Sequence, residues 1–445
     1  MGSESYLNVR LAMVVAGEDQ IPNYDYLSYG GRGFSYNLGW PIVLSIIYSI
    51  IPINIHLISG FLSIFFGLLS ILMLYLILYK LKFSKLQRIL IVFILILSPA
   101  FIYASNLSSS VIVTIALSFI SFYLMNSNKK INHALSLLIL FLIPLFSFVF
   151  GLFVLFILVL YILIIDRSKL KFLIIAILVM SVSYIYYLFL FGVPEPINFK
   201  ANDNSIINYF SELGANFGLS FFAVVLSLFG LNSLKSEKNV KIFIYILFFI
   251  SIILASLYLE ILFYFSIMIA IFAGIGLTNL FHDKWESEII RKTTIFILVV
   301  GIAFFGISYI GRTINLEPNV FLVEGIGFLE NNVDSKDTVA AHYKLGHYIT
   351  YAGIRNIMDS YFIYAPKLNK RYVDMNEFFY AQDINAANKF IKDYSVDYIM
   401  FDDYTYNLLY KNKLRNTYLP YYLNNDKRFR IVFENEGVTI WKVFQ

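Results

Sequence analysis

Long apolar segments constrain this chain more than any other feature. Ten of them approach the roughly 20 residues that a helix needs to cross a bilayer. Only 14% of the 445 residues are charged and 59% are hydrophobic, which is too apolar for a soluble protein of this length. We therefore predict a polytopic α-helical membrane protein with about ten transmembrane helices. The segments lie near residues 55–79, 88–104, 108–125, 131–147, 149–165, 170–192, 216–233, 240–258, 260–281 and 291–312.

Lys and Arg residues are distributed unequally between the loops that join these segments. If the first segment runs inward, the inner loops hold 15 Lys and Arg residues, whereas the outer turns between segments hold only Lys200. Because basic residues stay on the cytoplasmic side, this asymmetry predicts the orientation. The N-terminus and everything after Arg312 are then extracytoplasmic.

The apolar stretch 38–52 differs from the ten predicted spans. It is short, begins at Gly39-Trp40-Pro41 and ends at Pro52. Counting it as a span would break the charge alternation, so we predict a helix lying along the membrane interface.

The predicted orientation places the N-terminus outside, but residues near Met1 do not resemble a signal sequence that would carry it across the membrane. We expect that a further transmembrane helix precedes Met1, so that the sequence is N-terminally truncated or starts at an internal methionine. The alternative is translocation of a short N-terminal tail after synthesis. The predicted organisation is thus residues 1–54 as an external loop with interfacial helices, 55–312 as the transmembrane domain, and 313–445 as an extracytoplasmic domain.

Residues 313–445 have the composition of a soluble domain, with 15 Lys and Arg against 16 Asp and Glu. Strands are predicted at 339–343 and 396–401, with an amphipathic helix at 383–392 before the second strand. A hairpin around Glu436-Gly437 is predicted to close the domain. We therefore expect a small α/β domain.

Composition and missing motifs exclude several classes of function. The chain has no cysteine, so thiolate metal sites and cysteine nucleophiles are excluded. Its 18% aromatic content comes without a basic patch, which indicates membrane interfaces rather than nucleic acid. Charges are nearly absent from the apolar segments, which argues against ion-coupled transport. A transporter or flippase is therefore only a third option.

Glu4 is the first candidate for chemistry. Ser3 is a plausible N-cap and Gly17 a plausible stop, which predicts a short helix with Glu4 in its first turn. Such a carboxylate could act as a base or metal ligand at the membrane surface. Taken alone, an acid in a first helical turn is more often ordinary helix chemistry.

The residues around Glu4 favour the catalytic role over the ordinary helical one. Glu4-Ser5-Tyr6, Arg10, residues 21–32 and residues 36–41 together resemble the first external loop of the C-type (GT-C) membrane glycosyltransferases. That superfamily includes the catalytic subunits of oligosaccharyltransferases. The resemblance implies a GT-C-like fold, a loop that follows the first transmembrane helix, and an acidic residue essential for transfer at Glu4.

Two further segments are similar to the oligosaccharyltransferase group. Ser211-Glu212-Leu213-Gly214 resembles a late external loop that contacts the acceptor, which implies an acceptor-binding role for Glu212. Residues 342–351 stand where that group has a Trp-Trp-Asp-Tyr-Gly motif that recognises the acceptor. The resemblance therefore implies acceptor-binding roles for Tyr343 and Gly346.

The chain also departs from that pattern. The second external loop, residues 104–110, contains no Asp or Glu, although oligosaccharyltransferases keep acidic metal ligands there. A divalent cation needs several oxygen ligands, so a Mg²⁺ or Mn²⁺ site would depend on Glu4, Glu212 and neutral groups. The tryptophans and aspartate of the acceptor motif are missing, which weakens the case for an asparagine sequon as acceptor.

Transfer from a lipid-phosphate sugar also needs positive charge near the departing phosphate. Arg10 and Arg32 are the candidates, because a guanidinium can bind two phosphate oxygens. Arg32 and Lys200 could instead extend to lipid headgroups. His342 and His347, at odd spacing on a predicted strand, would face opposite sides, so we expect solvent-exposed histidines rather than a shared metal site.

These features predict a membrane glycosyltransferase of the cell membrane or an endoplasmic-reticulum-type membrane. It would transfer a sugar or oligosaccharide from a polyprenyl- or dolichyl-phosphate donor to a protein or glycan acceptor on the extracytoplasmic face. The alternative is a non-catalytic GT-C-like protein that binds lipid-linked glycans or a partner. Membrane lipids are expected partners and nucleic acids are not.

Overall fold

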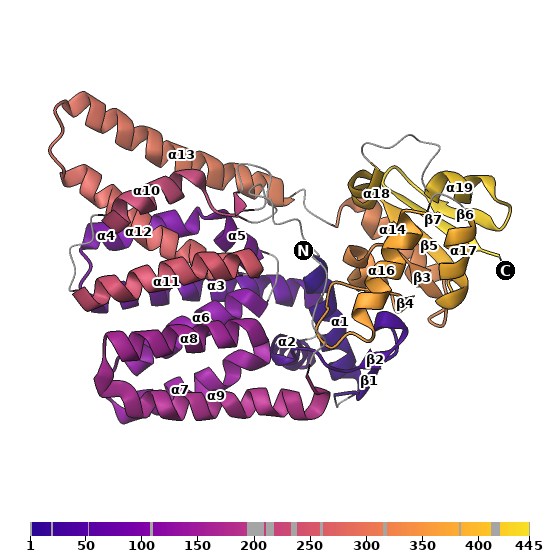
Figure 1. The fold of residues 1–445 in the computed structure, drawn as a ribbon, viewed down its shortest axis with the longest axis horizontal. Coiled ribbons are helices and arrows are strands. Elements are labelled where there is room, and N and C mark those ends of the chain that lie inside the picture. The colour runs from indigo at the N-terminus through magenta and orange to yellow at the C-terminus, as the bar shows by residue number, and fades with distance from the viewer. Residues whose placement is uncertain are drawn as a thin grey trace.

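The protein consists of a helical bundle and a smaller α/β unit at one end of it (Figure 1). The structure, a computed structural model, describes residues 2–18, 21–51, 53–106, 110–193, 209–210, 218–232, 238–258, 261–314, 318–381, 384–410 and 419–444. The first helix and a short β-hairpin lie between the bundle and the α/β unit (Figure 1).

Helices occupy all ten of the predicted apolar segments. By length and composition, four helices among the described residues could cross a membrane, or five if one bent pair forms a single span. The chain is thus a multi-pass membrane protein, but the predicted count of about ten spans is not confirmed. The bundle contains α3 (Ile55–Lys80), α4 (Lys85–Ile96), α5 (Pro99–Asn106), α6 (Ser110–Met125), α7 (Lys130–Phe146), α8 (Phe148–Ile164), η2 (Arg167–Lys169), α9 (Leu170–Phe191), α10 (Phe221–Asn232), α11 (Lys238–Leu257), α12 (Leu262–His282) and α13 (Glu288–Ile314).

The prediction of one continuous helix over 88–104 is wrong. The chain bends by 63° between α4 and α5. Pro99 explains the break, because proline has no N–H to donate and disfavours helical backbone at the residue before it. Proline at the first position of α5 is well tolerated.

Small residues allow helices α10 and α12 to pack closely. A Cβ atom on Gly230 would lie 1.9 Å from the carbonyl oxygen of Phe272, and one on Gly276 would lie 2.3 Å from that of Leu226. Backbones that approach this closely stabilise helix pairs in membranes through dispersion contacts. Gly230 and Gly276 are therefore close-packing positions of this helix pair.

The N-terminal segment forms α1 (Ser3–Glu18), β1 (Tyr24–Asp25), η1 (Ser28–Gly30), β2 (Arg32–Gly33) and α2 (Gly39–Ile50). Glu4 lies in the first turn of α1 as predicted. Gly17 does not end the helix, which continues to Glu18. The helix predicted at 38–52 is present as α2, and its position along the membrane interface stays a prediction.

The C-terminal unit is built on a five-stranded sheet with strand order β4-β3-β5-β7-β6. Strand β3 is parallel to β4 and β5, whereas β7 is antiparallel to β5 and β6. Its elements are α14 (Val320–Asn332), β3 (Thr338–Ala340), η6 (Tyr343–Leu345), α15 (Gly346–Tyr351), β4 (Arg355–Asn356), α16 (Leu368–Phe379), α17 (Ile384–Asp393), β5 (Tyr398–Asp402), α18 (Asp403–Tyr410), α19 (Leu419–Asn425), β6 (Phe429–Glu434) and β7 (Val438–Val443).

Alternating side chains of the central strand β5 fill two hydrophobic cores. Tyr398 and Met400 pack with α14 and α15, while Ile399 and Phe401 pack with helices α16, α17 and α19 on the opposite face. This alternation is what a strand covered on both faces requires. The predicted strand at 396–401, the helix at 383–392 and the closing hairpin are confirmed.

Replacing Gly230 with alanine should lower stability by about 1–3 kcal/mol, because the added methyl group would overlap the Phe272 carbonyl. Thermal unfolding of the purified protein in detergent would measure the loss. Gly311→Ala in α13 is the matched control, because nothing lies within 4 Å of its added Cβ. Equal melting temperatures for the two variants would contradict the packing argument.

Candidate functional site

Glu4 is an exposed residue in the first turn of α1. Helix α1 lies at the end of the bundle nearest the α/β unit (Figure 1). Its carboxylate Oε1 accepts a hydrogen bond of 3.4 Å from the hydroxyl of Ser110, the first residue of α6. Two helix N-termini, those of α1 and α6, therefore meet at this carboxylate. Both macrodipoles favour a negative charge there, and the carboxylate is open to solvent.

Tyr6 fixes the position of this end of α1. Its ring lies 4.8 Å from that of Tyr348 and 4.9 Å from that of Tyr351, both on α15. His56, at the start of α3, donates to or accepts from the Tyr351 hydroxyl at 2.9 Å. The helix that carries Glu4 is thus packed against both the bundle and the C-terminal unit.

One turn beyond Tyr6, Arg10 forms a buried ion pair with Asp25. The two guanidinium nitrogens of Arg10 donate to the two carboxylate oxygens of Asp25 at 3.0 and 2.6 Å. Tyr36 donates its hydroxyl to the same carboxylate at 2.5 Å. Burial acts to raise the pKa of Asp25, but the interactions with Arg10 and Tyr36 outweigh it and hold that pKa well below its usual range.

Asp25 also orders the backbone that follows it. Its Oδ1 atom accepts from the backbone N–H groups of Leu27 at 3.0 Å and Ser28 at 3.4 Å. Such hydrogen bonds from following backbone N–H groups form an Asx-turn, which Asp side chains favour. The ion pair therefore joins α1 to the loop that contacts the C-terminal unit.

Loop residues 27–29 dock on the C-terminal unit through buried polar contacts. Ser28 donates its hydroxyl to Asp359 at 2.6 Å, and the Tyr29 hydroxyl donates to the Asp359 carbonyl at 2.8 Å. Asn356 accepts from the Tyr29 backbone N–H at 2.8 Å, and its own backbone N–H donates to Leu27 at 2.9 Å. These contacts join residues more than 320 positions apart in the sequence.

Arg32 strengthens the same interface. Its guanidinium donates to the carbonyl oxygens of Tyr361, at 2.9 Å, and Ile363. It also lies 5.1 Å from the ring centroid of Tyr36, which contacts Arg10 as well. Arg10 and Arg32 are thus brought together, but both are buried with internal acceptors. The predicted phosphate-binding role would require either side chain to leave those acceptors, so it stays a prediction that this geometry does not favour.

Gly346 lies under this interface. Its carbonyl accepts from the Asn356 side chain at 2.9 Å, and a Cβ atom would lie 2.4 Å from the Met358 carbonyl oxygen. Tyr343 is buried, with its ring 5.6 Å from that of Phe362. The structure therefore places both residues in the packing beneath the docked loop, and their predicted contact with an acceptor stays a prediction.

The two predicted exposed histidines are buried, so that expectation is wrong. The chain leaves the sheet at Ala340, and His342 then caps a 3₁₀ turn by accepting from the Lys344 N–H at 3.5 Å. His347 lies in α15, with Nδ1 3.8 Å from the Asp359 carboxylate. Burial lowers the pKa of both histidines, that of His342 to about 3 with help from the positive charge of Lys344.

Glu212 and Lys200 lie outside the described residues, so the predicted acceptor contact of Glu212 is not located. Within the described ranges, no three His, Asp or Glu side chains gather closely enough to hold a metal ion. A divalent cation needs several oxygen ligands, and this part of the chain does not supply such a set.

Sequence reasoning missed the residues that dock the loop, namely Asp25, Asn356 and Asp359. A local signal existed for Asp25, because an Asp three residues before Ser28-Tyr29-Gly30-Gly31 is typical of a turn. Asn356 and Asp359 gave none, because their partners lie at the other end of the sequence.

With this geometry in hand, comparisons with solved structures define the class of the fold. The similar structures are those of GT-C glycosyltransferases, and the chain therefore has the GT-C fold. Identities of 10% to 12% among these three mean that the likeness concerns the fold alone. No family model matches the sequence, and no curated protein matches it either.

Among these structures is the oligosaccharyltransferase of Archaeoglobus fulgidus, with a TM-score of 0.65 and 11% identity over 90% of this chain. The chain spans only 66% of that enzyme. The same enzyme, AglB, in complex with an inhibitory peptide and a dolichol-phosphate gives a TM-score of 0.66 at 12% identity, covering 90% of this chain and 65% of that one.

A third is ArnT from Cupriavidus metallidurans, bound to undecaprenyl phosphate. It gives a TM-score of 0.53 at 10% identity, over 99% of this chain and 93% of that one.

Replacing Arg10 with methionine should lower stability by about 3–5 kcal/mol, because Asp25 would be left buried without its cation. The control is Arg428→Met, which removes an ion pair with Asp426 whose Arg428 side chain is 47% exposed. That pair should contribute less than about 1 kcal/mol. Thermal unfolding in detergent measures the stability of both variants. Similar losses of stability would show that the Arg10–Asp25 pair contributes no more than the exposed pair.

Acid should destabilise the C-terminal unit through His342. The unfolded chain binds a proton near the ordinary pKa of 6.5, whereas the folded one does so only at about 3. The unfolded state thus holds more protons in this window, so the free energy of unfolding falls as pH drops from about 6.5, by up to ~1.4 kcal/mol per unit. His342→Asn keeps an acceptor for the Lys344 N–H, and its melting temperature should depend less on pH than that of the wild type. The same pH dependence in both proteins would show that His342 is not responsible.

Proposed function

We propose that this protein is a membrane glycosyltransferase that moves a sugar from a polyprenyl- or dolichyl-phosphate donor to an acceptor at the extracytoplasmic surface. The observation that carries the proposal is the exposed Glu4 carboxylate at the junction of α1, α6 and α15, within a GT-C fold. The solved neighbours include complexes with dolichol-phosphate and undecaprenyl phosphate, which supports a lipid-linked donor.

In the proposed reaction Glu4 takes or orients the proton of the acceptor nucleophile. The nucleophile forms a bond to the anomeric carbon as the bond from that carbon to the phosphate oxygen breaks, and the lipid phosphate leaves with the electron pair. A carboxylate held beside two helix N-termini is suited to accept that proton.

Arg10, Arg32, Tyr343 and Gly346 act in this proposal mainly by holding the loop against the C-terminal unit. Positioning of this kind contributes to catalysis, because a misplaced acid or base loses much of its effect. Whether Arg10 or Arg32 also contacts the donor phosphate, and Glu212 the acceptor, belongs to the same proposal. The positive-inside distribution supports an extracytoplasmic C-terminal unit.

The second candidate is a non-catalytic GT-C-like protein that binds lipid-linked glycans or a partner. The second external loop lacks acidic residues, and the described residues supply no metal-binding set. Titration calorimetry that shows tight binding of polyprenyl phosphate, with no transfer to any of a panel of acceptors, would favour this candidate.

Glu4→Gln should reduce sugar transfer by about 10²–10⁴-fold, because the amide cannot accept a proton. Transfer of radiolabelled sugar from polyprenyl-phosphate donors in proteoliposomes measures it, using the longest natural form of the chain. Glu436→Gln, an exposed acid in the β6–β7 turn, is the control and should keep full activity. Full activity in the Glu4 variant would rule out Glu4 as the base.

A further inference from the structure

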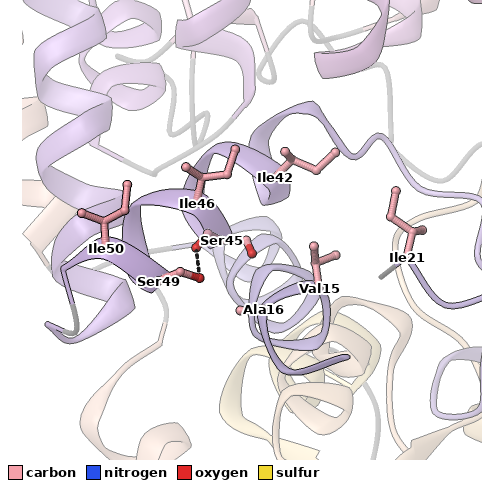
Figure 2. A pocket seen from close by; sticks show the side chains of 8 residues that line it. All are labelled: Val15, Ala16, Ile21, Ile42, Ser45, Ile46, Ser49 and Ile50. Carbon is pink, nitrogen blue, oxygen red and sulfur yellow. Dashed lines mark hydrogen bonds between the residues drawn. The ribbon is translucent and has the colours of Figure 1, made fainter. Parts of the chain in front are cut away.

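An apolar groove runs between α2 and the end of α1. It has a volume of about 450 Å³ and is lined by eight side chains. Figure 2 shows Ile42, Ile46 and Ile50 in a row along α2, with Val15 and Ile21 from the neighbouring segment. Ala16, Ser45 and Ser49 complete the lining.

The lining offers almost nothing to a polar ligand. Six of the eight residues are hydrocarbon, none is charged, and Ser49 already donates its hydroxyl to the Ser45 carbonyl at 2.9 Å. An exposed groove with such a lining favours apolar contacts over polar ones. The groove therefore suits a hydrocarbon better than a sugar or a phosphate.

The position of the groove indicates where that hydrocarbon comes from. Helix α2 starts against the last turn of α7, where a Cβ on Gly39 would lie 2.9 Å from the Leu145 carbonyl oxygen, and it ends shortly before α3. Both α3 and α7 belong to the membrane bundle. The groove thus lies at the end of the bundle, where the predicted interfacial position of α2 would bring it to the level of the bilayer surface.

Exposed apolar side chains continue from the groove toward the bundle. Ile46 and Ile50 are 55% and 73% exposed, and the series goes on through Ile53 at 52% to Phe61 on α3 at 73%. Large exposed apolar side chains of this kind mark contact with a partner or a membrane, and beside a membrane bundle they suit lipid. A lipid tail in the groove would therefore remain in contact with the bilayer along its length.

We propose that one acyl tail of a bilayer phospholipid occupies the groove between α1 and α2. The occupant is a membrane lipid rather than the sugar donor, because the lining does not include Glu4 or any other residue of the proposed site. The tail would fill the space between the two helices that carry the first loop and anchor α2 in the membrane. This proposal does not depend on glycosyl transfer.

The test is photo-crosslinking in vesicles of phosphatidylcholine that carries a diazirine in the middle of one tail. Peptides spanning residues 12–23 and 41–51 should be labelled at saturable, one-to-one stoichiometry. The double variant Ala16→Phe/Ser49→Phe fills the groove and should lose this labelling at least about tenfold, the effect of excluding two or more methylenes. Ile64→Phe, which alters an exposed position on α3, is the matched control and should keep it.

Three results would overturn the proposal: no enrichment of these peptides over the exposed face of α3, unchanged labelling in the filled variant, or displacement of the label by an equimolar amount of polyprenyl phosphate. The last would assign the groove to a prenyl chain. Equal melting temperatures of the filled variant and the wild type would establish that lost labelling reflects the groove and not unfolding. If the filled variant is unstable, the single Ser49→Phe variant and the competition arm still decide the question.

Discussion

The buried ion pair between Arg10 and Asp25 organises the end of the molecule at which Glu4, Arg32, Tyr343 and Gly346 lie. Removing two charges from water is costly, and the cost is offset only when their geometry and their remaining hydrogen bonds are well satisfied. Here Asp25 has both guanidinium nitrogens of Arg10, the Tyr36 hydroxyl and two backbone N–H groups. The pair therefore fixes helix α1 and the loop after it as one unit.

This unit then joins the membrane bundle to the C-terminal unit. Ser28, Tyr29 and Arg32 reach the segment that follows β4, while Tyr6 packs on α15 and Glu4 reaches the start of α6. Three parts of the chain thus meet around one exposed carboxylate. The proposed transfer would need such an arrangement, because a lipid-bound donor and an acceptor on the aqueous side would approach from different phases. The groove beside α2 would add a lipid contact to the same unit.

Much of the local structure could be predicted from the sequence. Apolar runs predicted the positions of the helices. The run Tyr398-Ile399-Met400-Phe401 predicted the central strand of the C-terminal sheet, because burial on both faces favours consecutive hydrophobic residues. The exceptions have local causes. Pro99 broke a helix that hydropathy treated as continuous, and His342 left the strand because its side chain caps the following turn.

The sequence by itself determined that the chain resides in a membrane, where its helices lie, and that Glu4 stands in a first helical turn. Those properties depend on hydrophobicity and on neighbours a few residues apart. Only the tertiary structure decided that Asp25 pairs with Arg10, that Ser28 meets Asp359, and that both histidines of residues 342–351 are buried. The reason is physical: a polar side chain in a loop looks the same in sequence whether it faces water or a partner 331 positions away, and only folding selects between them.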